Sequence, residues 1–322
     1  MKYCTLGSTG IQVSGLCFGT MSFGGDADEA TSAALFARCR EAGINFFDCA
    51  NVYNGGRAEE ILGRLIRGCR DELVITTKVY GAMCSDPNDC GLSRRHITRA
   101  VESSLRRLGT DRIDLYFVHQ FDDNTPMEET LSAMNDLVRS GKIVYPAVSN
   151  WAAWQIMRAL GKSELHEWSR FACIQPMYSL AKRQAEVEIL PLAQAESLGV
   201  IPYSPLGGGL LTGKYGRAKR PDAGRLVDNS MYARRYQSDT HYEVAERFVE
   251  HARSRGVHPA SLAVAWVMSH PAVTAPIIGA RNLEQLQPSL ESVEVSMTPE
   301  WRSEISSLSP TPPPATDRSE NQ

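Results

Sequence analysis

The 322-residue sequence predicts an α/β fold in which eight parallel strands close into a (β/α)8 barrel, the TIM barrel. Two observations lead to this prediction. Short runs of β-branched and aromatic residues recur along the chain, and segments with apolar residues at helical spacing lie between them. Strands separated by helices pair in parallel through right-handed crossovers, and eight such units close naturally into a barrel.

The expected barrel strands are eight short runs that end in polar or small residues. They are Leu16–Thr20, Ile44–Phe47, Leu73–Thr77, Leu115–Val118, Ile143–Ser149, Ala172–Gln175, Val200–Ser204 and Ala275–Ile278. Segments with helical periodicity between them include 31–42, 97–108, 131–140, 187–197 and 244–255. An open, doubly wound sheet is the alternative, but no strand is followed by the G-x-G-x-x-G turn of its dinucleotide sites.

Three segments fall outside this alternation. Residues 2–5 and 11–14 flank Gly7-Ser8-Thr9-Gly10 and predict an N-terminal β-hairpin that covers the bottom of the barrel. Residues 206–237, after the seventh barrel strand, form a loop too long for a plain connection. Residues 309–322 are polar and proline-rich, which predicts a disordered tail after a single domain spanning 1–308.

The composition of the chain indicates what kind of molecule it binds. The chain is 43% hydrophobic and 22% charged, with a net charge of −3, and it has no long basic run. These features argue against nucleic acid or an anionic membrane as the main partner, so we expect a small molecule.

The eight cysteines are scattered, with neither a C-x-x-C pair nor a Cys/His cluster at metal-ligand spacing. They indicate reduced thiols and no metal site. The N-terminus lacks an apolar signal core, and no apolar stretch approaches the length of a membrane helix, so a cytoplasmic protein is expected.

Polar side chains gather where the expected strands end, which is where the active sites of such barrels lie. These residues are Asp48, Lys78, His119, Asn150 and Gln175, and Tyr53 follows closely after Asp48. Singly, each has a structural explanation, such as a loop cap, a half-buried aromatic residue or a surface lysine. Their joint placement at successive strand ends favours a catalytic site.

The chemistry of four of these residues fits carbonyl reduction. A phenol is a poor acid at neutral pH, but a nearby ammonium such as that of Lys78 stabilises the phenolate and lowers its pKa. Asp48 is expected to hold Lys78 protonated and oriented. His119 is expected to donate a hydrogen bond to a substrate oxygen on which negative charge develops.

On these residues the chain resembles the aldo-keto reductases. Asp48 with Tyr53, Lys78 after Ile75-Thr76-Thr77, and His119 after Leu115-Tyr116-Phe117-Val118 match the catalytic tetrad of that family. The resemblance covers residues 1–308. It extends to Gly19-Thr20-Met21, Val148-Ser149-Asn150-Trp151, Gln175-Pro176-Met177-Tyr178, Tyr203-Ser204-Pro205-Leu206, Leu211-Thr212-Gly213-Lys214-Tyr215 and Gly279-Ala280-Arg281-Asn282.

The resemblance implies NADPH-dependent reduction of an aldehyde or ketone, reversible as alcohol oxidation. Tyr53 would be the general acid, Lys78 and Asp48 would tune it, and His119 would orient the carbonyl. Ser149, Asn150 and Gln175 match positions that bind the carboxamide, and Tyr203 matches the aromatic residue on which the nicotinamide stacks. Further cofactor-binding positions implied by the resemblance are Gly19, Thr20, Met21, Asp48 and Gly279.

The cofactor phosphates would bind to the long loop and to the segment after the last strand. Ser204, Leu206, Gly208, Lys214 and Arg225 match positions that clasp the pyrophosphate. Arg281 and Gln285 match positions near the adenosine 2′-phosphate. An arginine there favours NADP over NAD, with NADH as an alternative cofactor.

Three departures from the family pattern stand out. Ser289, preceded by Pro288, replaces an asparagine that many relatives carry near the adenine, and Ser179 likewise replaces an asparagine. Pro146 lies within an expected strand, where its missing amide would break a ladder bond unless a bulge accommodates it.

Two alternative functions stay open at this stage. Some relatives of this kind hold the cofactor tightly and serve as regulatory subunits with little turnover. An aldolase-like site would use Lys78 as a Schiff-base amine, but this needs a depressed pKa, which Asp48 would oppose. Met21, Tyr80, Phe121 and Trp151 are candidates for an apolar substrate pocket, with the loop 81–91 at its rim.

Overall fold

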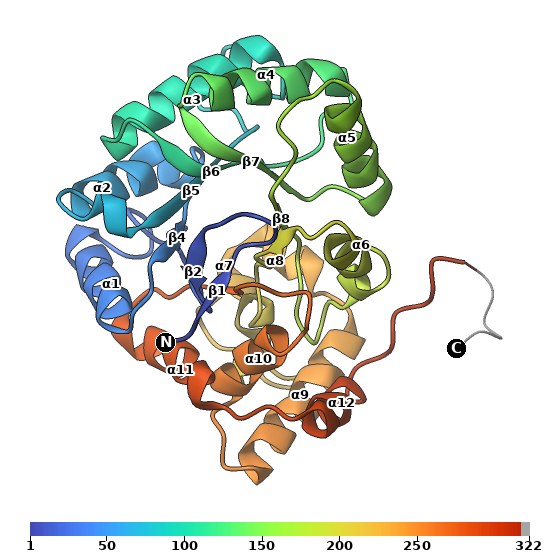
Figure 1. Cartoon of the computed structure of the whole chain (residues 1–322). Helices are drawn as coiled ribbons and strands as arrows, with labels where there is room; N and C mark the ends of the chain where they lie inside the picture. Colours follow the sequence, from blue (N-terminus) through green and yellow to red (C-terminus); the bar gives the residue numbers. More distant parts are fainter. Residues whose placement is uncertain (317–322) are drawn as a thin grey trace.

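The computed structural model describes residues 1–316 and confirms the barrel (Figure 1). Its parallel sheet has the strand order β10-β3-β4-β5-β6-β7-β8-β9. The amide of Ile277 donates to the carbonyl of Pro202 at 2.8 Å, and that of Ala275 to Val200 at 3.2 Å, which joins the two ends of the sheet. The strands are β3 (Cys17–Gly19), β4 (Phe46–Asp48), β5 (Val74–Val79), β6 (Ile113–Val118), β7 (Ile143–Ser149), β8 (Cys173–Gln175), β9 (Gly199–Val200) and β10 (Ile277–Ile278).

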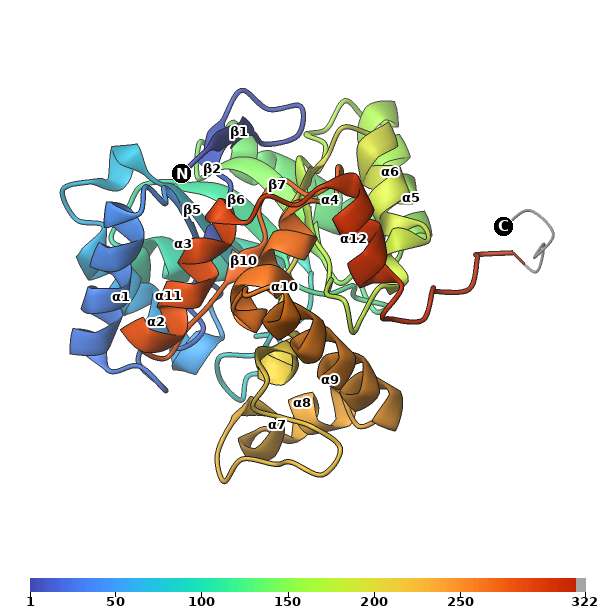
Figure 2. The same cartoon turned by 90° about the horizontal axis from the view of Figure 1, so that it is seen from below.

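The predicted N-terminal hairpin is present as β1 (Tyr3–Thr5) and β2 (Gln12–Ser14), paired antiparallel. Leu6 and Val13 are fully buried in the same apolar cluster as the residues inside the barrel. Gly7 has φ +53°, and a Cβ on it would lie 2.4 Å from the amide nitrogen of Gly199, so only glycine fits this close approach. Figure 2 shows the hairpin at one end of the barrel and the long loop at the other.

Helices surround the strands. They are α1 (Glu29–Glu41), α2 (Arg57–Leu65), α3 (Arg94–Leu108), α4 (Met127–Arg139), α5 (Ala153–Leu165), α6 (Ile189–Ala195), α7 (Arg225–Asp228), α8 (Ser230–Arg235), α9 (Asp239–Ser254), α10 (Pro259–Met268), α11 (Leu283–Leu290) and α12 (Pro299–Ser306). Of the helices that begin earlier than their apolar spacing predicts, α1 and α3 do so because the first turn is polar and a side chain caps it. Asp28 accepts a hydrogen bond from the amide of Thr31, and Ser93 from that of His96.

Pro146 lies in β7 without a bulge, because the pairing register with β6 is the same on both sides of it. Its carbonyl accepts a hydrogen bond from the amide of Ala172. In a parallel ladder the amide and carbonyl of one residue face the same neighbour. The missing amide therefore faces the segment just before β8, which begins at Cys173. Pairing with β8 has not yet started there, so no ladder bond between β7 and β8 is lost.

The long loop after β9 is partly helical: it holds a 3-10 segment at Gly207–Thr212 and the short helices α7 and α8. After α12, residues 309–316 form neither helix nor strand, and residues 317–322 of the expected tail lie outside the described residues. All eight cysteines carry free thiols. Within residues 1–316, no helix is long and apolar enough to cross a membrane.

Candidate active site

Strand periodicity explains why polar residues meet at one end of the barrel. Side chains at alternate strand positions point to the same face, and the interior cluster contains Phe46, Phe117, Ala147, Cys173 and Ile201. Two residues further along each chain segment stand the polar or aromatic side chains of the site. These are Asp48, His119, Ser149, Gln175 and Tyr203.

Asp48 and Lys78 form a buried ion pair at this end. The Lys78 Nζ lies 2.7 Å from each carboxylate oxygen of Asp48 and also donates to the carbonyl of Cys49 at 2.6 Å. Asp48 Oδ1 accepts further hydrogen bonds from Thr76 Oγ1 at 2.7 Å and Gln175 Nε2 at 2.9 Å. Burial lowers the pKa of Lys78, but the charge of Asp48, the hydrogen bond to it and the charge of Tyr53 together outweigh burial, so the net pKa is raised. Lys78 is therefore a permanent cation.

Tyr53 lies against this pair, on a turn that follows β4. Its Oη is 3.5 Å from Lys78 Nζ, and the ammonium is 5.1 Å from the centre of the Tyr53 ring. Asn54, in the left-handed region at φ +49°, fixes the turn by donating to the carbonyls of Met21 and Phe23.

The pKa of Tyr53 differs from the expectation. Burial raises it, Lys78 lowers it and Asp48 raises it, so the net shift is upward. The contribution expected from Lys78 is present, but burial outweighs it. The phenol is therefore fully protonated at neutral pH and keeps a proton to donate.

His119 faces Tyr53, with the ring centres 6.2 Å apart and the rings edge to face. Burial, and then the charge of Lys78, lowers the pKa of His119 to about 3, so its imidazole is neutral. Asn150, held at φ +58°, donates to the carbonyl of His119 at 2.9 Å and accepts from Tyr203 Oη at 2.8 Å. These bonds connect the backbone at His119 to Tyr203.

A cavity of about 1120 Å³ opens at this end of the barrel. Tyr53, Asp48 and His119 line it, and Lys78 lies behind them with no exposed surface. The predicted cofactor residues that line it are Gly19, Met21, Asp48, Ser149, Asn150, Gln175, Tyr203, Ser204, Leu206, Gly208, Lys214, Arg225, Gly279, Arg281 and Gln285. Thr20 is fully buried behind the wall, and its amide and hydroxyl both donate to the carbonyl of Asp48.

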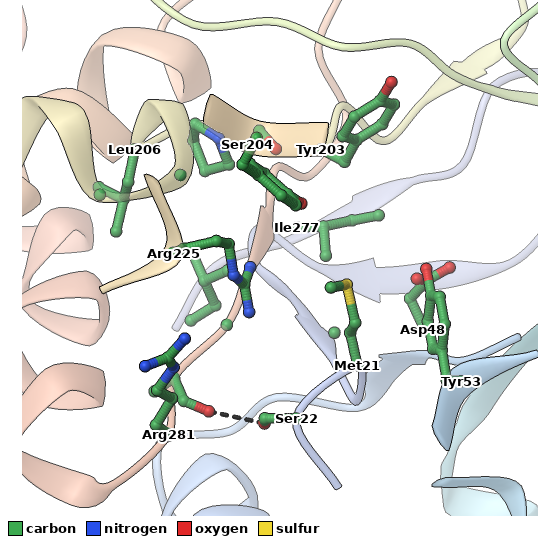
Figure 3. Close-up of a pocket in the computed structure, with 18 of the residues that line it drawn as sticks. Met21, Ser22, Asp48, Tyr53, Tyr203, Ser204, Leu206, Arg225, Ile277 and Arg281 are labelled. Atoms are coloured by element: carbon green, nitrogen blue, oxygen red, sulfur yellow. Dashed lines mark hydrogen bonds between the residues drawn. The ribbon is translucent and has the colours of Figure 1, made fainter. Parts of the chain in front are cut away.

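The cavity has two chemically different ends. Figure 3 shows Asp48 and Tyr53 on one side and Arg225 and Arg281 on the other, with Met21 and Ile277 between them. Arg281 Nε lies 3.0 Å from Asp26, so this guanidinium already has a carboxylate partner. Gly208, at φ +67°, has no room for a Cβ, which would lie 2.9 Å from the Tyr232 ring.

The departures from the family pattern lie at the arginine end or outside the cavity. Pro288 lines the cavity, and its carbonyl accepts from Ser261 Oγ at 2.6 Å. Ser289 is fully buried, and its hydroxyl has no hydrogen-bond partner within the described chain. Ser179 is also fully buried and does not line the cavity.

The family assignment follows from comparison with known proteins. The family model described as "Aldo/keto reductase family" matches residues 15–310. The chain belongs to the aldo/keto reductase family. It is 40% identical over 324 residues to "Uncharacterized oxidoreductase YrpG" of Bacillus subtilis (strain 168), with 97% of each chain covered.

Two further relatives have more specific names. The chain is 38% identical over 302 residues to "Probable voltage-gated potassium channel subunit beta" of Arabidopsis thaliana, with 92% of each chain covered. It is 32% identical over 333 residues to "Versiconal hemiacetal acetate reductase" of Aspergillus parasiticus, covering 93% of this chain and 94% of the relative. Members of the aldo/keto reductase family act on small carbonyl compounds, and this chain is an oxidoreductase of that type.

Some residues of this aldo/keto reductase cavity were not predicted. Ser22 lines it and donates to the carbonyl of Ala280 at 2.7 Å (Figure 3), and Asn54, Tyr232, Arg235 and His258 also line it. Asn54 follows directly on Tyr53, which could have indicated it. The others lie on loops or short helices whose path no strand periodicity predicts.

The expected apolar substrate pocket is only partly formed. Met21 and Tyr80 line the cavity, together with Gly81 from the rim loop. Phe121 and Trp151 do not; their rings pack edge to face at 4.9 Å, and Trp151 is buried. Among residues 1–316, no group of three or more His, Cys, Asp or Glu side chains is placed to hold a metal ion.

Proposed function

We propose that this protein catalyses NADPH-dependent reduction of an aldehyde or ketone, with Tyr53 as the general acid. The observation that carries the proposal is the position of the Tyr53 hydroxyl, 3.5 Å from a buried ammonium and on the wall of a large cavity. A bound reduced nicotinamide would supply the hydride that the carbonyl carbon accepts.

The four residues divide the work at the carbonyl oxygen. The protonated phenol of Tyr53 donates a proton as negative charge develops there, and the fixed cation of Lys78 stabilises the phenolate that remains. Asp48 keeps Lys78 charged and in place. His119, as a neutral imidazole, donates a hydrogen bond to the same oxygen and orients the carbonyl.

The same geometry disfavours an aldolase-like role for Lys78. A Schiff base needs a neutral amine with access to substrate. Lys78 has no exposed surface, its Nζ donates to Asp48, Cys49 and Tyr53, and its net pKa is raised.

The residues lining the cavity suit the groups of NADPH. Lys214, Arg225 and Arg281 supply positive charge at one end, and Gly208 and Gly209 line that end without side chains of their own. At the other end, Asn150 and Gln175 offer amide groups for a carboxamide. The arginine at position 281 favours NADP over NAD, because it can pair with a 2′-phosphate.

The proposal is tested by fluorescence titration with NADPH and NADH, followed by NADPH oxidation with a panel of aldehydes and ketones. We expect the wild-type protein to turn over and Tyr53→Phe to lose about 10²- to 10⁴-fold in kcat while NADPH binding is retained. Equal activity of the two proteins would exclude Tyr53 as the acid.

A second candidate is a cofactor-binding regulatory subunit with little turnover. It is favoured by the names of the relatives in Arabidopsis thaliana and Oryza sativa subsp. japonica, both "Probable voltage-gated potassium channel subunit beta". If wild type and Tyr53→Phe were equally inactive across the panel while both bound NADPH, this second candidate would replace the first.

A further inference from the structure

One cation that lines the cavity, Arg235, has no role in the proposed binding of the cofactor phosphates. Arg235, the last residue of α8, lines the cavity and is half-buried. Lys214, Arg225 and Arg281 are the cations that the proposed function assigns to the pyrophosphate and the 2′-phosphate. Arg235 has no such role.

Arg235 lies between the phosphate-binding group and Tyr203: its guanidinium carbon and that of Arg225 are 4.9 and 5.2 Å from the centre of the same Tyr232 ring. The charges of Arg281, Arg225 and Asp228 act on Lys214, whose pKa is lowered first by burial and then by the two arginines. Arg235 instead acts on Tyr203, whose pKa is raised by burial and lowered in part by Arg235. Arg235 also acts on Lys182, whose pKa is lowered by burial and then by Arg235. Arg235 is thus grouped with Tyr203.

The position of Tyr203 places Arg235 near the carbonyl end. The guanidinium carbon of Arg235 is 5.9 Å from the centre of the Tyr203 ring and 4.9 Å from that of Tyr232. Tyr203 Oη reaches Asn150 at 2.8 Å, and Asn150 bonds the carbonyl of His119. Two side chains therefore separate Arg235 from the catalytic histidine.

Arg235 also lacks a negative partner. Among residues 1–316 no carboxylate lies within ion-pair distance of it, and its contacts are the two tyrosine rings. Three other half-buried arginines are paired, Arg281 with Asp26, Arg70 with Asp114 and Arg183 with Glu186, whereas Arg225, like Arg235, is in no ion pair of residues 1–316. A guanidinium held over aromatic rings keeps its donors free for a planar anion.

We propose that Arg235 binds an anionic group of the substrate, so that the preferred substrates are aldehydes or ketones carrying a carboxylate or a similar anion. The proposal rests on the proposed function for the carbonyl chemistry and goes beyond it in naming the substrate class. The carbonyl lies at Tyr53 and His119, and the anion reaches toward the α8 side of Tyr203.

The test compares Arg235→Gln with Arg234→Gln. Arg234 is the neighbouring residue, is exposed and does not line the cavity, so its variant removes the same charge from the same helix. The probes are 4-carboxybenzaldehyde and its neutral methyl ester. We expect Arg235→Gln to lower the ratio of the two kcat/KM values, acid over ester, at least tenfold. Arg234→Gln should leave the ratio at its wild-type value, and Arg235→Lys should keep part of it.

Binding gives a second measurement that does not depend on turnover. Calorimetric titration of the NADP⁺-saturated proteins with 4-carboxybenzaldehyde should show at least tenfold weaker binding to Arg235→Gln than to wild type. Equal binding overturns the proposal. So does a loss of NADPH affinity that matches the loss for the aldehyde, since Arg235 would then contact the cofactor phosphates.

The outcomes also separate this proposal from the proposed function. If wild type reduces both aldehydes and Arg235→Gln leaves their ratio unchanged, the substrate class is wrong and the reductase activity stands. If wild type reduces neither while the carboxylate binds through Arg235, the anion site stands and the reductase activity fails.

Discussion

Both carboxylate oxygens of Asp48 lie 2.7 Å from the ammonium nitrogen of Lys78, and the two side chains are 3% and 0% exposed. The pair is thus almost completely buried, although Asp48 lines the cavity. In such a place each charge is tolerated only because the other is present. If Tyr53 is the acid, as proposed, it depends on a pair whose lysine has no exposed surface.

Asp48→Asn should destabilise the protein by about 3–5 kcal/mol, because it leaves the ammonium of Lys78 buried without a counter-charge. Urea unfolding of wild type and variant measures this loss. The double variant Asp48→Asn/Lys78→Met removes both charges and should recover most of the stability. A double variant as unstable as the single one would show that the pair's charge is not the cause.

The stability of the protein should depend on pH through His119. Its pKa is about 3 in the folded protein, against an ordinary value of about 6.5. Between these values the unfolded chain binds a proton that the folded protein does not, so the free energy of unfolding rises with pH. The contribution of neutral His119 to the free energy of unfolding is fully present above pH 6.5 and is lost as the pH falls toward 3.

We therefore expect the unfolding free energy of wild type to fall more steeply below pH 6.5 than that of His119→Gln, by up to about 1.4 kcal/mol per pH unit. Urea denaturation at pH 5, 6 and 7 measures both slopes. Parallel curves for the two proteins would mean that His119 titrates normally. Because the imidazole stays neutral, kcat of wild type should also show no inflection from His119 between pH 5 and 8.

Arg281→Ala should weaken NADPH binding about tenfold or more and NADH binding much less, because only NADPH offers a 2′-phosphate to a charged donor. Fluorescence titration with both nucleotides measures the two dissociation constants. Asp26→Asn removes the carboxylate 3.0 Å from Arg281 Nε and should not weaken NADPH binding. Equal losses for both nucleotides in Arg281→Ala would place the arginine elsewhere on the cofactor.

Gly208→Ala should weaken NADPH binding about tenfold, since strain of 1–3 kcal/mol at φ +67° and a Cβ 2.9 Å from Tyr232 displace the loop. Gly161→Ala is the matched control. Gly161 lies inside α5 with no atom within 4 Å of an added Cβ, so alanine should stabilise the helix slightly and leave NADPH binding unchanged. NADPH binding to Gly208→Ala at wild-type strength would show that the loop accommodates a side chain.

The barrel and the strand-end residues could be predicted because both follow from local periodicity. Asp48, His119 and Gln175 each stand two positions beyond a buried interior residue, so alternation along the strand places them in the site. The ends of β9 could not be predicted in this way. The continuous strand is only Gly199–Val200. Pro202 has no amide to donate toward β10, pairing on the β8 side is reduced to the isolated bridge Met177↔Tyr203, and Ser204 is left-handed at φ +60°, which ends the extended backbone.

The pKa of Tyr53 and the role of Arg235 required the three-dimensional structure. The sequence places a cation near the phenol, but the upward net shift comes from burial, which no spacing reveals. Arg235 looks like its exposed neighbour Arg234 in sequence, and only the fold of the loop turns one of them toward the cavity.

Because β10 pairs with β3, the barrel can close only after almost the whole chain has been synthesised. The pairs Ile277↔Cys17 and Ile278↔Phe18 join the two ends of the chain, and the thiol of Cys4 also reaches the carbonyl of Thr274. During synthesis β3, the first strand of the barrel, leaves the ribosome early. Its edge that pairs with β10 stays unpaired until almost the whole chain has been made. A polypeptide released before residue 277 would carry two open sheet edges, which makes it a substrate for chaperones or proteases rather than a smaller enzyme.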